Sequence, residues 1–145
     1  MTTAPLSPSP LPDWAGRPAP EELPLLRYAF GAKDRGVLKV GQNLKYDSHI
    51  FANHHVHLRG IAHDTLLQSY VFESHKSHDM DSLALRHLGK KTISFEEVCG
   101  KGASQICFDQ VDLERATAYA AEDADITFQL HQAMWPQIEH DAKLR

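Results

Sequence analysis

The chain has 145 residues, of which 42% are hydrophobic and 23% are charged, and its formal net charge at neutral pH is −4. This length allows one domain with a real core but not two, and the composition is ordinary for a soluble globular protein. The sequence has no run of about 18 apolar residues, which excludes a transmembrane helix, and no signal peptide, so we expect a cytoplasmic protein without a membrane partner.

The net negative charge and the small number of cysteines exclude further classes of protein. A basic patch is the usual mark of a nucleic-acid-binding domain, and the sequence shows none overall. A nuclease stays open, because the carboxylates of its site are acidic until cations bind. Cys99 and Cys107 are too few for a disulfide scaffold, and we expect both to be reduced and structural.

Residues 1–19 differ in composition from the rest of the chain. Most of the prolines lie there or directly after, at Pro5, Pro8, Pro10, Pro12, Pro18 and Pro20. Such a segment cannot bury enough apolar surface to offset the entropy lost on ordering. We therefore interpret residues 1–19 as a proline-rich disordered tail or linker, and residues 20–145 as the folded domain.

Short apolar segments alternate with amphipathic ones along residues 20–145. The first half predicts a helix from about Pro20, a buried strand over 37–40, a helix over 43–53, a strand over 61–64 and a helix over 65–72. The second half predicts a helix capped by Asp81 and ending at Leu88, a mixed segment over 90–111, and a long helix over 112–140 that Pro136 should end or kink. This alternation favours an α/β fold.

Two short motifs indicate chemistry. Tyr119 lies four residues before Asp123, and Asn43 lies four residues before Asp47. Residues i and i+4 share one face of a helix, so each motif can aim a carboxylate and a hydrogen-bonding partner into one cleft. Carboxylates gathered in this way hold cations such as Mg²⁺, and two such cations can drive the attack of water on a phosphodiester.

These motifs belong to a longer series of stretches, in fixed order. The others are Leu58–Thr65, His78–Ala84, Lys91–Glu97, Gln129–His131 and Met134–Pro136. From about Val37 to Gln137 the chain resembles the 3′–5′ proofreading exonuclease domain of bacterial DNA polymerase I (family A), a DEDD exonuclease with a tyrosine in its last motif. The resemblance implies a ribonuclease-H-like fold, and Mg²⁺- or Mn²⁺-dependent removal of 3′-terminal nucleotides from single-stranded DNA.

The resemblance also implies roles for individual residues. Asp123 is expected to be a direct metal ligand, and Asp47 to hold the second metal through water. The Tyr119 hydroxyl is expected to orient the attacking water or to contact the scissile phosphate. Asn43 is expected to contact the substrate or to support the metal shell. Lys45 and Tyr46, which lie beside Asp47 in the sequence, are expected to contact the DNA strand.

The residues themselves leave other interpretations open. Asp123 can be a solvated helix-surface charge, Tyr119 a core tyrosine with its hydroxyl at the rim, and Asn43 a helix N-cap. We interpret Glu122 and Asp125 as surface charge. Caps and turns account for Asp64, Thr65, Asp79 and Asp81, and the ten histidines are expected to be scattered over the surface.

The family's first motif, an Asp-x-Glu on an early strand, is absent. The acidic residues before Asn43 are Asp13, Glu21, Glu22 and Asp34, and none forms it. We therefore expect an N-terminally incomplete fold that lacks its opening strands. Because the lost pair would bridge both metals, we predict poor metal binding and little or no nuclease activity for the chain alone. An unpaired sheet edge also predicts marginal folding.

Three functions follow from these patterns. The first is a partial exonuclease domain of the DNA polymerase I type, whose partners are a single-stranded 3′ end of DNA and a polymerase domain or the missing strands in trans. The second is a non-catalytic fragment, or a degenerate DNA-contacting or structural module. The third is a ribonuclease D-like exonuclease acting on RNA, although the stretches at 43–47 and 78–84 favour the polymerase I type.

Overall fold

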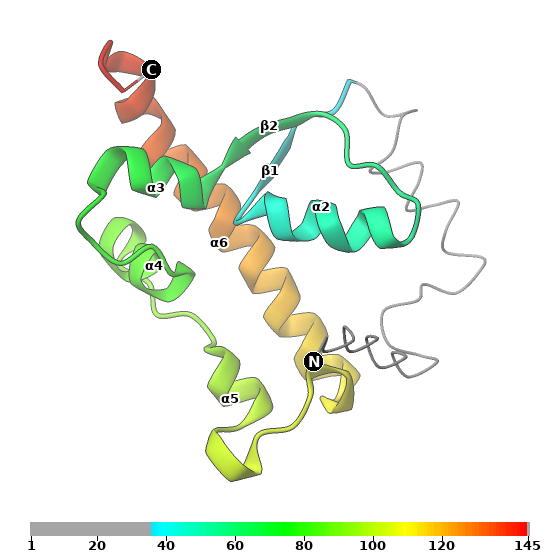
Figure 1. The fold of residues 1–145 in the computed structure, drawn as a ribbon. Coiled ribbons are helices and arrows are strands. Elements are labelled where there is room, and N and C mark those ends of the chain that lie inside the picture. The colour runs from blue at the N-terminus through cyan, green and yellow to red at the C-terminus, as the bar shows by residue number, and fades with distance from the viewer. Residues whose placement is uncertain (1–35, 145) are drawn as a thin grey trace, which may run out of the picture.

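The computed structural model of the protein describes residues 36–144. The predicted tail and the predicted helix from Pro20 lie outside the described residues. The elements are β1 (Lys39–Gly41), α2 (Leu44–Asn53), β2 (Ile61–Asp64), α3 (Thr65–Glu73), α4 (Met80–Leu88), α5 (Phe95–Cys99), η1 (Gly102–Ser104), η2 (Phe108–Gln110) and α6 (Leu113–His140), shown in Figure 1. Their mixture of strands and helices confirms the α/β class. None of the helices over 36–144 is long and apolar enough to cross a membrane.

The strands β1 and β2 form a parallel pair, and α2 lies in the connection between them (Figure 1). Gly41 at the end of β1 pairs with Asp64 at the end of β2. Because parallel strands point the same way, α2 and α3 both begin at this carboxyl edge of the sheet. Open α/β sheets place their ligands at such an edge.

The prediction of a buried strand over 37–40 is wrong for the described structure. Val37 and Leu38 are 56% and 68% exposed, and all three residues of β1 are only half-buried. Within residues 36–144, β1 has a single neighbouring strand and packs against α6. A parallel strand becomes buried only when both of its faces and both of its edges are covered.

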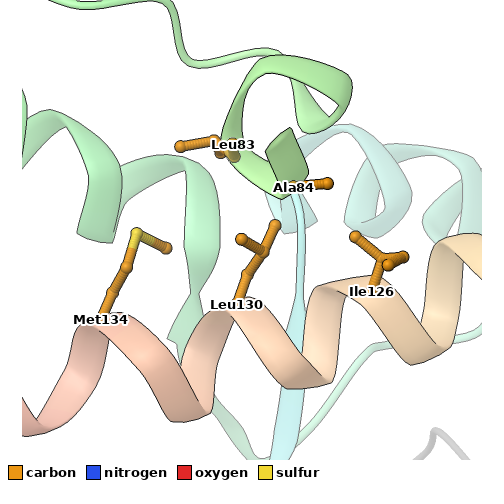
Figure 2. Packing of buried hydrophobic residues seen from close by; sticks show 5 residues of the cluster. All are labelled: Leu83, Ala84, Ile126, Leu130 and Met134. Carbon is orange, nitrogen blue, oxygen red and sulfur yellow. The ribbon is translucent and has the colours of Figure 1, made fainter. Parts of the chain in front are cut away.

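The core is built on one face of α6. Ile126, Leu130 and Met134 are spaced four residues apart and are at most 3% exposed, and they pack against Leu83 and Ala84 of α4 (Figure 2). This spacing places the three side chains in one stripe along the helix. The predicted periodicity of the long helix is therefore confirmed, and this stripe fixes α6 against the rest of the molecule.

The helix α6 continues through Pro136 to His140, as the predicted helix over 112–140 does. Of the two predicted effects of this proline, an end of the helix is wrong, and a kink stays a prediction. Pro136 has no N–H to donate to the carbonyl one turn earlier. Met134 and Ile138, on either side, are 0% and 3% exposed. Their burial offsets the lost hydrogen bond and keeps the last turns helical.

The predicted N-cap of α4 is wrong. Asp79, and not Asp81, caps α4, because its Oδ1 accepts the Ser82 N–H at 2.8 Å. Asp81 lies instead in the first turn, where its carboxylate is free to interact elsewhere. Gly89 ends α4 with a φ of 64°, as predicted, and Asp112 caps α6.

Candidate functional site

Tyr119 and Asp123 lie one turn apart on the half-buried side of α6. The Asp123 carboxylate lies close enough to the Tyr119 phenol to act on its pKa through its charge and as a hydrogen-bond partner. Burial, followed by the negative charge of Asp123, raises the pKa of the Tyr119 phenol to about 12. At neutral pH the phenol therefore keeps its proton, so that it acts as a hydrogen-bond donor and not as a base.

The Asp123 carboxyl is surrounded by other carboxylates. Burial is the main cause that raises its pKa, and the charges of Asp81 and Glu122 raise it further, while the hydrogen bond with Tyr119 lowers it. A partly desolvated carboxylate beside like charges gains most from a nearby cation or from a proton. Asp123 is thus not a fully solvated surface residue.

Three aromatic rings from three elements meet at Tyr119. The ring centroids of Phe95 (α5) and Phe108 (η2) lie 6.4 and 5.8 Å from that of Tyr119, and 6.4 Å from each other. Phe95 and Phe108 remain 43% and 40% exposed. Tyr119 is therefore packed through its ring and polar at its tip, beside an aromatic surface that is open to solvent.

The connection between α4 and α5 is fastened next to Asp123. The Thr92 Oγ1 donates to Asp81 Oδ1 at 2.7 Å, and the Ile93 N–H donates to Glu122 Oε2 at 2.6 Å. The interpretation of Glu122 as surface charge is therefore wrong, because its half-buried carboxylate holds a backbone N–H.

The second motif lies at the carboxyl edge of the sheet. Asp64 accepts N–H groups from both helix starts, from Leu44 of α2 at 2.7 Å and from Leu66 of α3 at 2.9 Å, and also from Asn43 at 3.0 Å. Asp47 lies in the first turn of α2. Burial chiefly raises the pKa of Asp47, and the charge of Asp64 raises it further. Asp64 thus joins two helices and lies near Asp47.

Asn43 does not lie on the helix that contains Asp47. It immediately precedes α2 with a φ of 61°, a left-handed conformation that asparagine tolerates, and its side chain makes no cap hydrogen bond. Asn43 thus occupies the N-cap position of α2, as the alternative interpretation has it, although its side chain does not cap the helix. The shared helical face with Asp47 is wrong, because Asn43 precedes the helix. Asn43, Lys45 and Tyr46 are all exposed, which leaves them accessible to a substrate.

The two predicted metal ligands belong to separate groups of charges. Asp81 and Glu122 act on Asp123, whereas Asp64 acts on Asp47. Among residues 36–144, no three His, Cys, Asp or Glu side chains are placed so that they could share a metal ion. The described residues therefore do not by themselves make a complete site for Mg²⁺ or Mn²⁺.

Several histidines depart from the predicted surface scatter, since His63, His78, His87 and His131 are all half-buried. His63 of β2 stacks on His131 of α6 with ring centroids 4.3 Å apart, and the Trp135 ring lies 4.3 Å from His63. These rings join the sheet to α6. Both cysteines are free thiols as predicted, but only Cys99 is buried and fits a structural role, since Cys107 is exposed.

Comparison with known proteins identifies the family of this chain. A family model described as 3′–5′ exonuclease matches residues 19–139. The chain belongs to this exonuclease family. Membership confirms the resemblance stated above and implies the ribonuclease-H-like fold, of which the described residues show the parallel β1–β2 pair and its helices.

The relatives of this exonuclease-family chain are much longer proteins. DNA polymerase I of Pseudomonas aeruginosa is 54% identical over 110 residues, which cover 74% of this chain and 12% of that protein. DNA polymerase I of Rhizobium leguminosarum is 40% identical over 122 residues, 83% of this chain and 12% of that protein. The DNA polymerase of Escherichia phage T5 is 30% identical over 123 residues, 72% of this chain and 14% of that protein. The chain thus spans a small part of these relatives.

The sequence did not predict three features of the site. These are the packing of Phe95 and Phe108 on Tyr119, the contact of Asp64 with the start of α2 as well as α3, and the hydrogen bond from the Ile93 N–H to Glu122. The spacing of residues along one helix shows which side chains share a face, but these contacts join distant segments. Ile93 and Glu122, for example, are 29 residues apart. Only Asp64, directly before Thr65, gave a signal, and it pointed to a single helix cap.

Proposed function

We propose that this chain carries part of a 3′–5′ exonuclease site that removes nucleotides from the single-stranded 3′ end of DNA. The observation that carries the proposal is the Tyr119–Asp123 pair, in which a protonated phenol faces a half-buried carboxylate. The hydroxyl supplies a hydrogen-bond donor for a water molecule or a phosphate oxygen. The carboxylate supplies negative charge that attracts a cation.

Features around the pair suit a single-stranded substrate. Phe95 and Phe108 leave ring surface exposed beside Tyr119. Unstacked bases bind to such rings, and each stacked base contributes about 1–3 kcal/mol. Further contacts to the strand come, in this proposal, from Asn43, Lys45 and Tyr46. DNA is favoured over RNA because the relatives named above are DNA polymerases.

Mg²⁺ or Mn²⁺ is the proposed cofactor, and Asp123 and Asp47 are its proposed ligands. The described residues bring too few carboxylates together to complete the site, so metal binding by the chain alone is expected to be weak. We accordingly propose that its activity is much lower than that of an intact relative. A polymerase domain, or strands supplied in trans, would be the partner that completes the site.

A second candidate is a non-catalytic, DNA-contacting module. It is favoured because no three His, Cys, Asp or Glu side chains among residues 36–144 are placed to share a metal ion, whereas two-metal hydrolysis needs several ligands around one phosphate. The exposed residues around Tyr119 and Tyr46 could then bind a single strand without cleaving it. No observation favours a ribonuclease D-like activity over these two.

The experiment that separates the candidates follows release of a 3′ label from a single-stranded DNA oligonucleotide in Mn²⁺. Wild-type protein, Asp123→Ala and the matched control Asp125→Ala are compared, since Asp125 is an exposed residue of the same helix. We expect slow release by wild type and by the control, and none by Asp123→Ala. Binding of the oligonucleotide without any release would replace the first candidate by the second.

A further inference from the structure

We propose that Glu122 is a positioning residue, which fastens the α4–α5 connection to α6 and thereby sets the Phe95 ring against Tyr119. The inference rests on the proposed function. It gives a role to a carboxylate whose neighbour, Asp123, is the proposed ligand. Glu122 itself is expected to act through Phe95 and Tyr119, and not by touching the substrate.

The contact made by Glu122 is strong and direct. Its Oε2 accepts the Ile93 N–H at 2.6 Å, and a bond from a backbone N–H to a carboxylate is stronger than one between neutral groups. Ile93 lies two residues before Phe95, the first residue of α5. The bond therefore fixes the residues just before α5 to α6, while the body of α5 is held by the Arg115 guanidinium of α6, which donates to the Glu97 carbonyl at 2.7 Å.

The start of α5 transmits this position to the ring. Ser94 and Glu97 form a reciprocal cap, in which the Ser94 N–H donates to Glu97 Oε2 at 2.8 Å and the Glu97 N–H donates to Ser94 Oγ at 3.2 Å. This cap leaves little freedom between Ile93 and Phe95. The Phe95 ring then meets Tyr119 edge-on at 6.4 Å.

The contacts that run from Glu122 through Ile93 and Phe95 to Tyr119 begin and end on a single turn of α6. Tyr119 and Glu122 are three residues apart, so both lie on the same side of the helix. Glu122 holds the connection at its backbone, and Tyr119 receives the ring that the connection carries. A change at Glu122 is thereby expected to reach the Tyr119 hydroxyl through the Phe95 ring. Because the charge of Glu122 also acts on Asp123, the effect of the bond has to be separated from the effect of the charge.

The residue directly before Ile93 is held independently. Thr92 is 6% exposed, and its Oγ1 donates to Asp81 Oδ1 at 2.7 Å. This bond joins the connection to α4, whose Leu83 and Ala84 belong to the core. Loss of the Glu122 bond should therefore shift the Phe95 end of the connection while α4 and α6 stay packed.

Two reciprocal substitutions separate the bond from the charge. Glu122→Gln keeps an oxygen that reaches the Ile93 N–H but removes the negative charge. Glu122→Asp keeps the charge but shortens the side chain, so that the oxygen no longer reaches. Asp125→Asn is the matched control, because Asp125 lies on the same helix, is exposed, and accepts from Gln129 Nε2 of its own helix at 2.5 Å.

The variants are compared in two assays, after circular dichroism has shown that each is folded. The first is the rate of 3′-label release from single-stranded DNA in Mn²⁺. The second is nuclear magnetic resonance of the free chain, which measures amide exchange of Ile93 and the proton contacts between the Phe95 and Tyr119 rings. The second assay does not depend on nuclease activity, so failure of the proposed function is recognised by an inactive wild type.

We expect Glu122→Asp to lower kcat about tenfold, since small displacements of a site are costly, to speed Ile93 exchange by at least about tenfold, and to weaken the ring contacts. Glu122→Gln and Asp125→Asn should stay within about threefold of wild type in both assays. The inference is overturned if Glu122→Gln is as impaired as Glu122→Asp, or if Ile93 exchange and the ring contacts are unchanged in Glu122→Asp. If the wild-type chain is inactive, the Ile93 exchange rate and the contacts between the Phe95 and Tyr119 rings test the inference alone, by the same criteria.

Discussion

At the scale of single residues, the property that suits Asp123 to attract a cation also makes it costly for the fold. Burial and the charges of Asp81 and Glu122 raise its pKa, which means that the ionised form is disfavoured in the folded chain. The same environment increases the gain from any positive charge that arrives. A residue retained for chemistry at the expense of stability is common in active sites.

Asp123→Asn is therefore expected to stabilise the chain at neutral pH. A carboxyl whose folded pKa lies above its ordinary value of 3.8 contributes stability that is complete below this value and is lost as the pH rises through the folded pKa. At pH 7 the ionised group is thus unfavourable, and an amide relieves the cost. Urea unfolding at pH 7 and pH 3 should show a gain for the variant at pH 7 that disappears at pH 3. A lower midpoint for the variant at pH 7 would contradict this reading.

Tyr119→Phe tests the hydroxyl without removing the ring. We expect an activity about 10- to 100-fold lower, as for the loss of one positioned donor in a site. Thermal stability should change little, because the contacts with Phe95 and Phe108 remain. Label release and the thermal midpoint are measured together. Tyr70→Phe is the control, since Tyr70 is 50% exposed and its ring packs on that of His78 and not on Phe95 or Phe108. Equal activity in the two variants would rule out a role for the Tyr119 hydroxyl.

At the scale of elements, Asp64 caps one helix and also joins it to a second one. Its carboxylate accepts N–H groups at the starts of both α2 and α3. Asp64→Ala should therefore cost about 3 kcal/mol of unfolding free energy, because buried N–H groups lose a charged acceptor. Asp112→Ala removes a cap from α6 alone and should cost about 1 kcal/mol. Urea unfolding measures both, and equal costs would show that the double contact is not important.

The stripe on α6 makes a second prediction at this scale. Leu130 is fully buried between α4 and α6, and Leu130→Ala should destabilise the chain by about 3 kcal/mol through lost burial and a residual cavity. Leu113→Ala, at a position that is 81% exposed, should change the unfolding free energy by less than about 0.5 kcal/mol. Similar effects of the two substitutions would mean that the core does not lie on this stripe.

Sequence patterns predicted most elements because each has a local cause. The stripe of Ile126 and Leu130 indicates the long helix, and Gly89 marks the end of α4. The errors arose where packing overrides local preference. Buried neighbours carry α6 through Pro136, and the left-handed backbone of Asn43 depends on its N–H bond to Asp64, which is distant in sequence.

The site was predictable only in part, for the same reason. Tyr119 and Asp123 share a face because one helix holds both, and their spacing alone predicts it. Glu122 cannot be distinguished from Asp125 by spacing, because its partner Ile93 lies on another segment. Asp47 lies on α2 and Asp123 on α6, so whether both can bind the same substrate depends on how these two helices are placed. No pattern within one segment of the sequence predicts that placement.

At the scale of the whole molecule, the described sheet leaves apolar residues uncovered. Val37 and Leu38, directly before β1, and Ile61 of β2 are 49 to 68% exposed. A sheet edge of this kind promotes association between chains. We predict marginal folding of the isolated chain, with a low thermal midpoint and a tendency to aggregate. Thermal unfolding followed by circular dichroism tests this, and a sharp, reversible transition well above room temperature would contradict it.

The central claim is that the Tyr119–Asp123 pair belongs to a 3′–5′ exonuclease site. The most direct test is the rate of 3′-label release from single-stranded DNA in Mn²⁺ by wild-type protein and by Asp123→Ala. The account predicts slow release by wild type and none by the variant, with both proteins folded. Release at the same rate by both proteins would contradict it. Binding of the oligonucleotide without release by a folded wild-type chain would instead replace this function by that of a non-catalytic, DNA-contacting module.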